Sequence, residues 1–170
     1  MDLIMKGKVV WQFDDNFNAD LIVGSEFINE RDPKILGEAC LASFVPDFYK
    51  TVEKGDLMIA GRNFGYGHPH YQGIVSLQTV GIPTLIAESF YPMWYRVALF
   101  QGFPPVVCPD ISKKAKIGDH LEVNIQTGEI TNLTTKETLK GEPMPDFLLE
   151  IIEAGGQVPY LKKITAEKSE

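Results

Sequence analysis

The hydrophobic positions of the chain change their period in the middle of the sequence. Residues 56–61, DLMIAG, form a short apolar run between glycines, which is typical of a strand buried on both faces. Residues 71–81 carry apolar side chains at helical spacing, and residues 82–89 form a second buried apolar run. Helical spacing returns over residues 90–102, with Pro92 in the first turn. The pattern predicts strand, loop, helix, strand and helix as the central unit.

Further elements are expected before this unit. Residues 6–13 are rich in β-branched and aromatic side chains and predict a strand, which runs into the turn-favouring loop DDNFNAD ending at Asp20. Asp32 stands directly before a proline, a combination typical of a helix start, so a helix is predicted over residues 32–41. Residues 46–52 predict another short helix.

The C-terminal part has a different pattern. Residues 116–142 alternate apolar and polar side chains around a Thr-Gly turn, which predicts an antiparallel β section. Residues 143–156 then predict an amphipathic helix that ends at two glycines, and residues 164–170 are expected to be a frayed tail. There is no internal repeat and no linker-like stretch. We therefore expect a single α/β domain over residues 1–170.

Composition and charge narrow the class of protein. The chain has 170 residues, 44% of them hydrophobic, and a net charge of −7. Its Lys and Arg residues are scattered, so neither nucleic acid nor an anionic membrane is an expected partner. No apolar run reaches the length of a membrane-spanning helix, and a cytoplasmic location is expected. Cys40 and Cys108 match no disulfide or metal-binding spacing and are expected to be buried thiols.

The stretch GRNFGYGHPHYQG, residues 61–73, carries the candidate chemistry. Backbone N–H groups around Gly65 and Gly67, ahead of a helix, could bind a carboxylate or phosphate, although the same pattern occurs in ordinary tight turns. His68 and His70 flank a proline, and imidazoles are suited to proton transfer. They could equally be surface residues, and a metal site would need ligands from elsewhere. We expect an exposed, mobile loop over residues 62–70 and no metal bound by this chain.

Several ordered motifs resemble a known family. GRNFGYG after KGDLMIAG, and the later IAESF, resemble segments of the small subunit of 3-isopropylmalate dehydratase, which corresponds to the swivelling last domain of aconitase. DDNFNADLI resembles the early Asp-rich loop of that family, TGEITNLTT its Thr-Gly hairpin, and EAGGQVPYLKK its closing segment. The resemblance covers most of the chain.

This resemblance implies a fold, a reaction and a partner. The fold would be a swivelling β/β/α domain with a mixed central sheet flanked by helices. The enzyme would be a hydro-lyase acting on a malate-like hydroxy acid, with a [4Fe-4S] cluster on a separate large subunit and no cofactor on this chain. The small subunit would supply substrate-binding and proton-transfer groups. Aromatic residues around the loop favour an alkyl-substituted substrate, and the isolated chain could form a homo-oligomer.

The sequence departs from the family at the residues that matter most for catalysis. His68 stands where the family has the proton-transferring Ser, and His70 stands where it has the Arg that binds a substrate carboxylate. Asp20 and Arg96 match the family. The resemblance thus makes His68 and Asp20 the catalytic residues, with proton transfer at His68 and Asp20 in the place of the family's active-site Asp. The substrate-binding residues would be Gly65, Tyr66, Gly67, His70 and Arg96.

Three functions are compatible with this departure. The first is a working hydro-lyase subunit in which the two histidines replace Ser and Arg. The second is a non-catalytic partner or assembly subunit that keeps the fold and the large-subunit interface. The third is a small-molecule binding module that acts alone. Association with a cluster-binding large subunit would separate the first two from the third.

Overall fold

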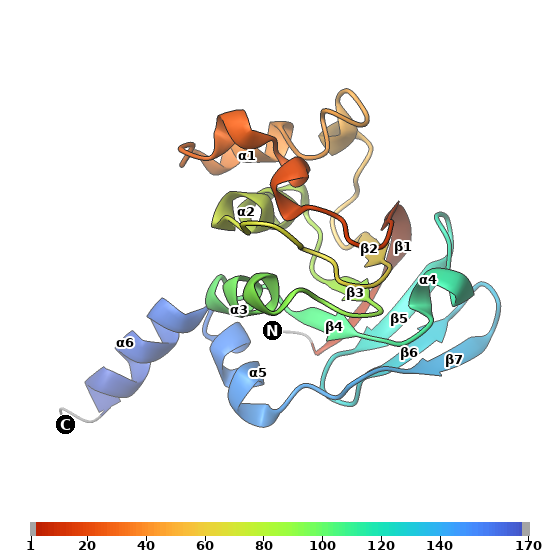
Figure 1. Ribbon diagram of the computed structural model, residues 1–170. Helices are drawn as coiled ribbons and strands as arrows, with labels where there is room; N and C mark the ends of the chain where they lie inside the picture. Colours follow the sequence, from red (N-terminus) through yellow and green to blue (C-terminus); the bar gives the residue numbers. More distant parts are fainter. Residues whose placement is uncertain (1–2, 168–170) are drawn as a thin grey trace.

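The computed structural model describes residues 3–167, which form one seven-stranded mixed sheet with helices on both faces (Figure 1). The strand order is β4-β3-β2-β1-β5-β6-β7. The first four strands in this order are parallel, and β5 to β7 continue the sheet in antiparallel fashion. The strands are β1 (Ile4–Phe13), β2 (Leu57–Ala60), β3 (Leu85–Ala87), β4 (Pro105–Val107), β5 (His120–Asn124), β6 (Glu129–Asn132) and β7 (Glu137–Lys140).

Strand β1 joins the parallel and antiparallel parts of the sheet. Its second half pairs with β2 in parallel, from Val9 opposite Leu57 to Phe13 opposite Ala60. Its first half pairs with β5 in antiparallel fashion, and an irregularity follows Val9. Because the β1 and β2 strands are parallel, their carboxyl ends meet at one edge of the sheet. The loops after these strands are therefore placed side by side.

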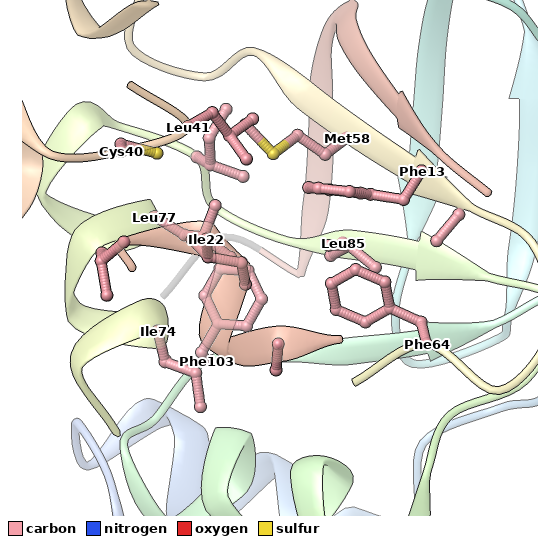
Figure 2. Packing of buried hydrophobic residues seen from close by; sticks show 14 of the residues in the cluster. Phe13, Ile22, Cys40, Leu41, Met58, Phe64, Ile74, Leu77, Leu85 and Phe103 are labelled. Atoms are coloured by element: carbon pink, nitrogen blue, oxygen red, sulfur yellow. The ribbon is translucent and has the colours of Figure 1, made fainter. Parts of the chain in front are cut away.

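The helices divide between the two faces of the sheet. Strand β2 is buried throughout, and its residues alternate between two hydrophobic clusters: Met58 and Ala60 face one, Leu57 and Ile59 the other. Figure 2 shows the first cluster, which includes Ile74 and Leu77 of α2 together with Phe13 and Phe64. The helices are α1 (Pro33–Glu38), α2 (Tyr71–Val80), α3 (Pro92–Phe100), α4 (Ile111–Lys114), α5 (Asp146–Glu153) and α6 (Gln157–Glu167).

Several local signals of the sequence are confirmed. The Asp32 carboxylate caps α1 by accepting the N–H of Lys34 at 2.9 Å. Pro92 begins α3, and Gly81 ends α2 in the left-handed conformation. The helix expected over residues 46–52 is shorter than predicted and is a single 3₁₀ turn, η3 (Phe48–Lys50).

The end of the chain differs from expectation. Residues 164–167, expected to be frayed, belong to α6, and residues 168–170 lie outside the described residues. Helix α6 contacts α3 and α5, and the Tyr160 hydroxyl donates to Glu150 Oε2 at 3.1 Å. These contacts stabilise a segment whose sequence alone gives only a weak amphipathic pattern. Among the helices of the described residues, none combines the length and apolar character needed to cross a membrane.

Candidate active site

The candidate site lies where the loops after β1 and β2 run together. The Gly65 N–H donates to the carbonyl of Phe17 at 3.0 Å, and the Ala19 N–H donates to the carbonyl of Tyr66 at 3.2 Å. These bonds join two segments that are almost fifty residues apart in the sequence. The loop that carries both histidines is thus held against the loop that ends at Asp20.

Two glycines allow the loop to pack closely against its neighbours, Gly65 against α3 and Gly67 against the loop that ends at Asp20. Gly65 has φ +86°, and a Cβ there would lie 2.3 Å from Trp94 Cγ. Gly67 has φ +107°, and a Cβ there would lie 2.8 Å from Asn18 Oδ1. Both the backbone conformation and the space therefore exclude a side chain at these positions. The Gly-x-Gly pattern therefore has a structural role, which is to let the loop pack against Trp94 and Asn18.

The loop is only partly exposed, in contrast to the prediction for residues 62–70. Phe64 is fully buried, with its ring centroid 4.9 Å from those of Phe13 and Trp94. Tyr66 is exposed, and its ring lies 5.9 Å from that of Tyr91. The aromatic core fixes the first half of the loop because burial of such a ring strongly favours a single arrangement. Arg62, Tyr66 and His68 are exposed, whereas Phe64 and Gly65 between them are buried.

Asp20 and His70, which the resemblance assigned to catalysis and to binding, are in direct side-chain contact. His70 Nδ1 lies 2.9 Å from Asp20 Oδ1, and the side chains are 40% and 28% exposed. Asp20 is in the 3₁₀ turn η1 (Ala19–Ile22), whose first turn is capped by Asn18 Oδ1 accepting the Asp20 N–H at 2.9 Å. His70 is the residue before the first turn of α2. Short elements with defined starts therefore position both side chains.

His68 and Arg96 are placed differently. The side chain of His68 is exposed and makes no hydrogen bond or ion pair within residues 3–167. Arg96 is exposed on α3, where it lines an open groove with Pro69, Tyr71 and Phe100. The structure therefore does not bring Arg96 into contact with the Asp20–His70 pair. The match of Arg96 to the family sequence does not reveal that Arg96 lies apart from Asp20 and His70.

A small cavity adjoins the Asp20–His70 pair. It has a volume of about 40 Å³ and is lined by both side chains together with Gln72 and residues of the segment around η2 (Ser25–Phe27). Gln72 is buried, and its Nε2 donates to the carbonyl of Ile28 at 2.6 Å. Its Oε1 has no partner within the described residues. Sequence analysis missed Gln72, although its spacing from Ser76 places two polar residues on the buried face of α2.

Comparison with known proteins identifies the family. No family model matches the sequence. The isopropylmalate/citramalate isomerase small subunit of Methanocaldococcus jannaschii is 44% identical over 167 residues, or 98% of this chain and 99% of the relative. The 3-isopropylmalate dehydratase small subunit of Ruminiclostridium cellulolyticum is 38% identical over 157 residues, 92% of this chain and 96% of the relative. The chain belongs to the 3-isopropylmalate dehydratase small-subunit family.

The fold expected from the family resemblance is also confirmed. A crystal structure of 3-isopropylmalate dehydratase from Methanocaldococcus jannaschii matches this chain with a TM-score of 0.88 and 33% sequence identity. The match covers 98% of both chains. The small-subunit family fold therefore extends through the mixed sheet and the helices around it, and includes the loops that carry Asp20 and His70.

The side chains of this family member do not fit an iron–sulfur cluster. Such a cluster is held by several thiolates, and the chain has two cysteines. Cys40 and Cys108 are buried in different hydrophobic clusters, and burial raises the pKa of each thiol to about 11. Within residues 3–167, no group of three or more His, Cys, Asp or Glu side chains is arranged to hold a metal ion. A cluster would have to be held by another chain.

Proposed function

We propose that this chain is the small subunit of a two-subunit hydro-lyase that acts on a malate-like hydroxy acid. The family match over nearly the full length supports the proposal, since it includes both loops of the candidate site. The observation that carries it is the Asp20–His70 contact at 2.9 Å. A carboxylate–imidazole pair at the matching site gives the chain a group able to transfer a proton, although the family's Ser and Arg are absent.

The cofactor is assigned to the large subunit. Two buried, protonated thiols in separate clusters support this assignment, because thiolates are the ligands of a cluster. A [4Fe-4S] cluster in such enzymes supplies Lewis-acid chemistry at the substrate hydroxyl. The chain described here contributes no ligand to it. Its own contribution is to bind carboxylates and to hold or transfer the proton, and a cytoplasmic location remains our expectation.

Substrate binding is proposed for groups on the same loop and on α3. The backbone amides of Tyr66 and Gly67 could donate to one carboxylate of the substrate, whereas the Gly65 N–H already donates to the carbonyl of Phe17 and contributes only through the backbone shape of the loop. Arg96 is exposed and charged, so it is available to a second carboxylate or to the large subunit. The exposed ring of Tyr66 and the neighbouring ring of Tyr91 favour an alkyl-substituted substrate. The relative from Methanocaldococcus jannaschii, named for isopropylmalate and citramalate, supports the same class.

The proposal is tested by reconstitution. The chain is produced together with a cluster-binding large subunit of the same family, and turnover is measured against alkylmalates, malate, citrate and the corresponding unsaturated diacids. We expect the absorbance of the unsaturated diacid to change only when both subunits are present. Turnover of alkylmalates should be faster than turnover of citrate. Stable association without turnover of any compound would favour the non-catalytic partner. Absence of association would favour the stand-alone binding module.

A further inference from the structure

The two histidines of the loop differ in whether another residue orients them. His70 Nδ1 is 2.9 Å from Asp20 Oδ1, whereas the side chain of His68 makes no hydrogen bond or ion pair within residues 3–167. A general base is most effective when a third group fixes its tautomer and the direction of its free nitrogen. This asymmetry between the histidines was invisible in the sequence.

We propose that His70, oriented by Asp20, is the residue of this chain that transfers the carbon-bound proton, a role that the family resemblance assigned to His68. The proposal rests on the proposed hydro-lyase function. A carboxylate can only accept a hydrogen bond, so the contact with Asp20 places the hydrogen of the neutral imidazole on Nδ1. Nε2 is then left as the acceptor, and within the described residues it has no partner.

In the proposed dehydration step, each bond that breaks is matched by a bond that forms. His70 Nε2 takes the proton from the carbon next to the one that bears the hydroxyl. The electron pair of the broken C–H bond forms the second bond between the two carbons as the C–O bond breaks. The proton and the departing hydroxide together make one molecule of water. Asp20 stabilises the imidazolium formed in this step and returns the same tautomer when the proton leaves. Hydration is the reverse sequence.

The surroundings of the pair provide room for this chemistry. The cavity of about 40 Å³ is lined by Asp20, His70 and Gln72, and it can hold a group of the size of a water molecule. Gln72 also lines the cavity, and its Oε1 atom is buried and unpaired within the described residues. His70 is nevertheless 40% exposed, which leaves a route to a substrate held between subunits.

The test compares histidine variants in the assembled two-subunit enzyme. His70→Ala, His68→Ala and His120→Ala are measured for kcat and KM with the substrate on which the wild-type complex is active. His120 is an exposed residue of β5 outside the site and serves as the matched control. His70→Asn is added because its amide can keep the hydrogen bond to Asp20 but offers no base at the position of Nε2. Each variant is also assayed with added imidazole.

We expect His70→Ala and His70→Asn to lower kcat by about 10²- to 10⁴-fold with a smaller change in KM. Added imidazole should restore part of the turnover of His70→Ala, because the smaller side chain leaves space for a soluble base. His120→Ala should be unchanged, and His68→Ala should lose far less in kcat than His70→Ala. A purely structural role of His70 would show no rescue by imidazole.

The assignment and the proposed function fail in distinguishable ways. If His68→Ala loses turnover and is rescued while His70→Ala keeps wild-type kcat, the assignment is overturned and the hydro-lyase function stands. The same holds if both variants keep wild-type kcat, or if His70→Ala loses turnover without rescue. If the wild-type complex turns over no compound of the substrate panel, the proposed function itself is contradicted, and this assignment with it.

Discussion

His70 Nδ1 and Asp20 Oδ1 lie 2.9 Å apart although the two residues are separated by 50 positions in the chain. Parallel pairing of β1 with β2 brings their loops to the same edge of the sheet, and backbone hydrogen bonds between the loops complete the approach. Asp20 and His70 are thus oriented by the scaffold rather than by sequence proximity.

The first prediction concerns the Gly65 position. Gly65→Ala should destabilise the fold by about 3 kcal/mol or more, because the new Cβ would lie 2.3 Å from Trp94 Cγ and the residue has φ +86°. Gly118→Ala is the matched control, since its φ is +94° and nothing lies within 4 Å of the added Cβ. The control should cost about 1 kcal/mol. Urea unfolding of both variants measures the difference, and equal losses would show that the Trp94 contact is unimportant.

The second prediction concerns the buried amide of Gln72. Gln72→Met, which keeps the side-chain size, should cost about 1–2 kcal/mol because the Ile28 and Glu30 carbonyls lose their donor. Gln78→Met is the control on the same helix: its Nε2 donates to Gln101 at 3.0 Å, but the residue is exposed. The control should change the unfolding free energy by less than about 0.5 kcal/mol. An equal effect of the two substitutions would contradict a stabilising role of the hydrogen bonds from Gln72 to the Ile28 and Glu30 carbonyls.

The third prediction is a pH dependence of stability. The backbone N–H of Arg62 donates to Asp15 Oδ1 at 2.7 Å and holds the pKa of that carboxyl below its ordinary value of 3.8. Because the pKa is lower in the folded state, the stabilisation is present above the unfolded value and is lost as pH falls through the folded value. Asp15→Asn should therefore lower the melting temperature by a constant amount above about pH 5.

Below pH 4 the difference between wild type and Asp15→Asn should shrink, because the wild-type carboxyl then binds its own proton. Thermal unfolding of both proteins between pH 7 and pH 3 measures it. Asp14→Asn is the neighbouring control, since the Asp14 side chain is exposed and has no hydrogen bond or ion pair in the described part of the chain. A constant difference down to pH 3, or an equal effect at Asp14, would contradict the assigned cause.

The fourth prediction concerns the two thiols. Burial raises the pKa of Cys40 and Cys108 from 9.0 to about 11, so the reactive thiolate is scarce near neutral pH. The folded chain should react with neither a disulfide reagent nor iron and sulfide within minutes at pH 7.5. After unfolding in urea, two thiols should react with the disulfide reagent. Rapid reaction of a thiol in the folded chain, or a stoichiometric cluster on it, would contradict the assignment of the cluster to a large subunit.

Much of the scaffold was predictable because its signals are local. DLMIAG is buried on both faces as strand β2, Asp32 caps α1, and Gly81 ends α2. Helix α6 was not predicted because the glycines before it indicated an end, and its stability depends on contacts with α3 and α5. Strand β4 has three residues, too few for a periodic pattern, and is stabilised by pairing with β3.

The candidate site was predictable in its residue types but not in their arrangement. The resemblance pointed to Asp20 and both histidines, yet only His70 contacts Asp20. Arg96 lines a groove beside Pro69 and Tyr71 and is not among the residues that line the cavity at Asp20 and His70. Such contacts depend on the rotation of helices and on loop pairing across the sheet, and neither is encoded in a local pattern.

The most direct test of the account is a double-mutant cycle between Asp20 and His70, measured as kcat of the complex assembled with the large subunit. Asp20→Asn should lower kcat at least about tenfold because the imidazole loses its orienting carboxylate, and His70→Ala should lower it by about 10²-fold or more. If the two residues act as one proton-transferring unit, the double variant is no slower than His70→Ala alone. Losses that multiply in the double variant, or wild-type kcat in either single variant, would contradict the claim that this pair transfers the proton.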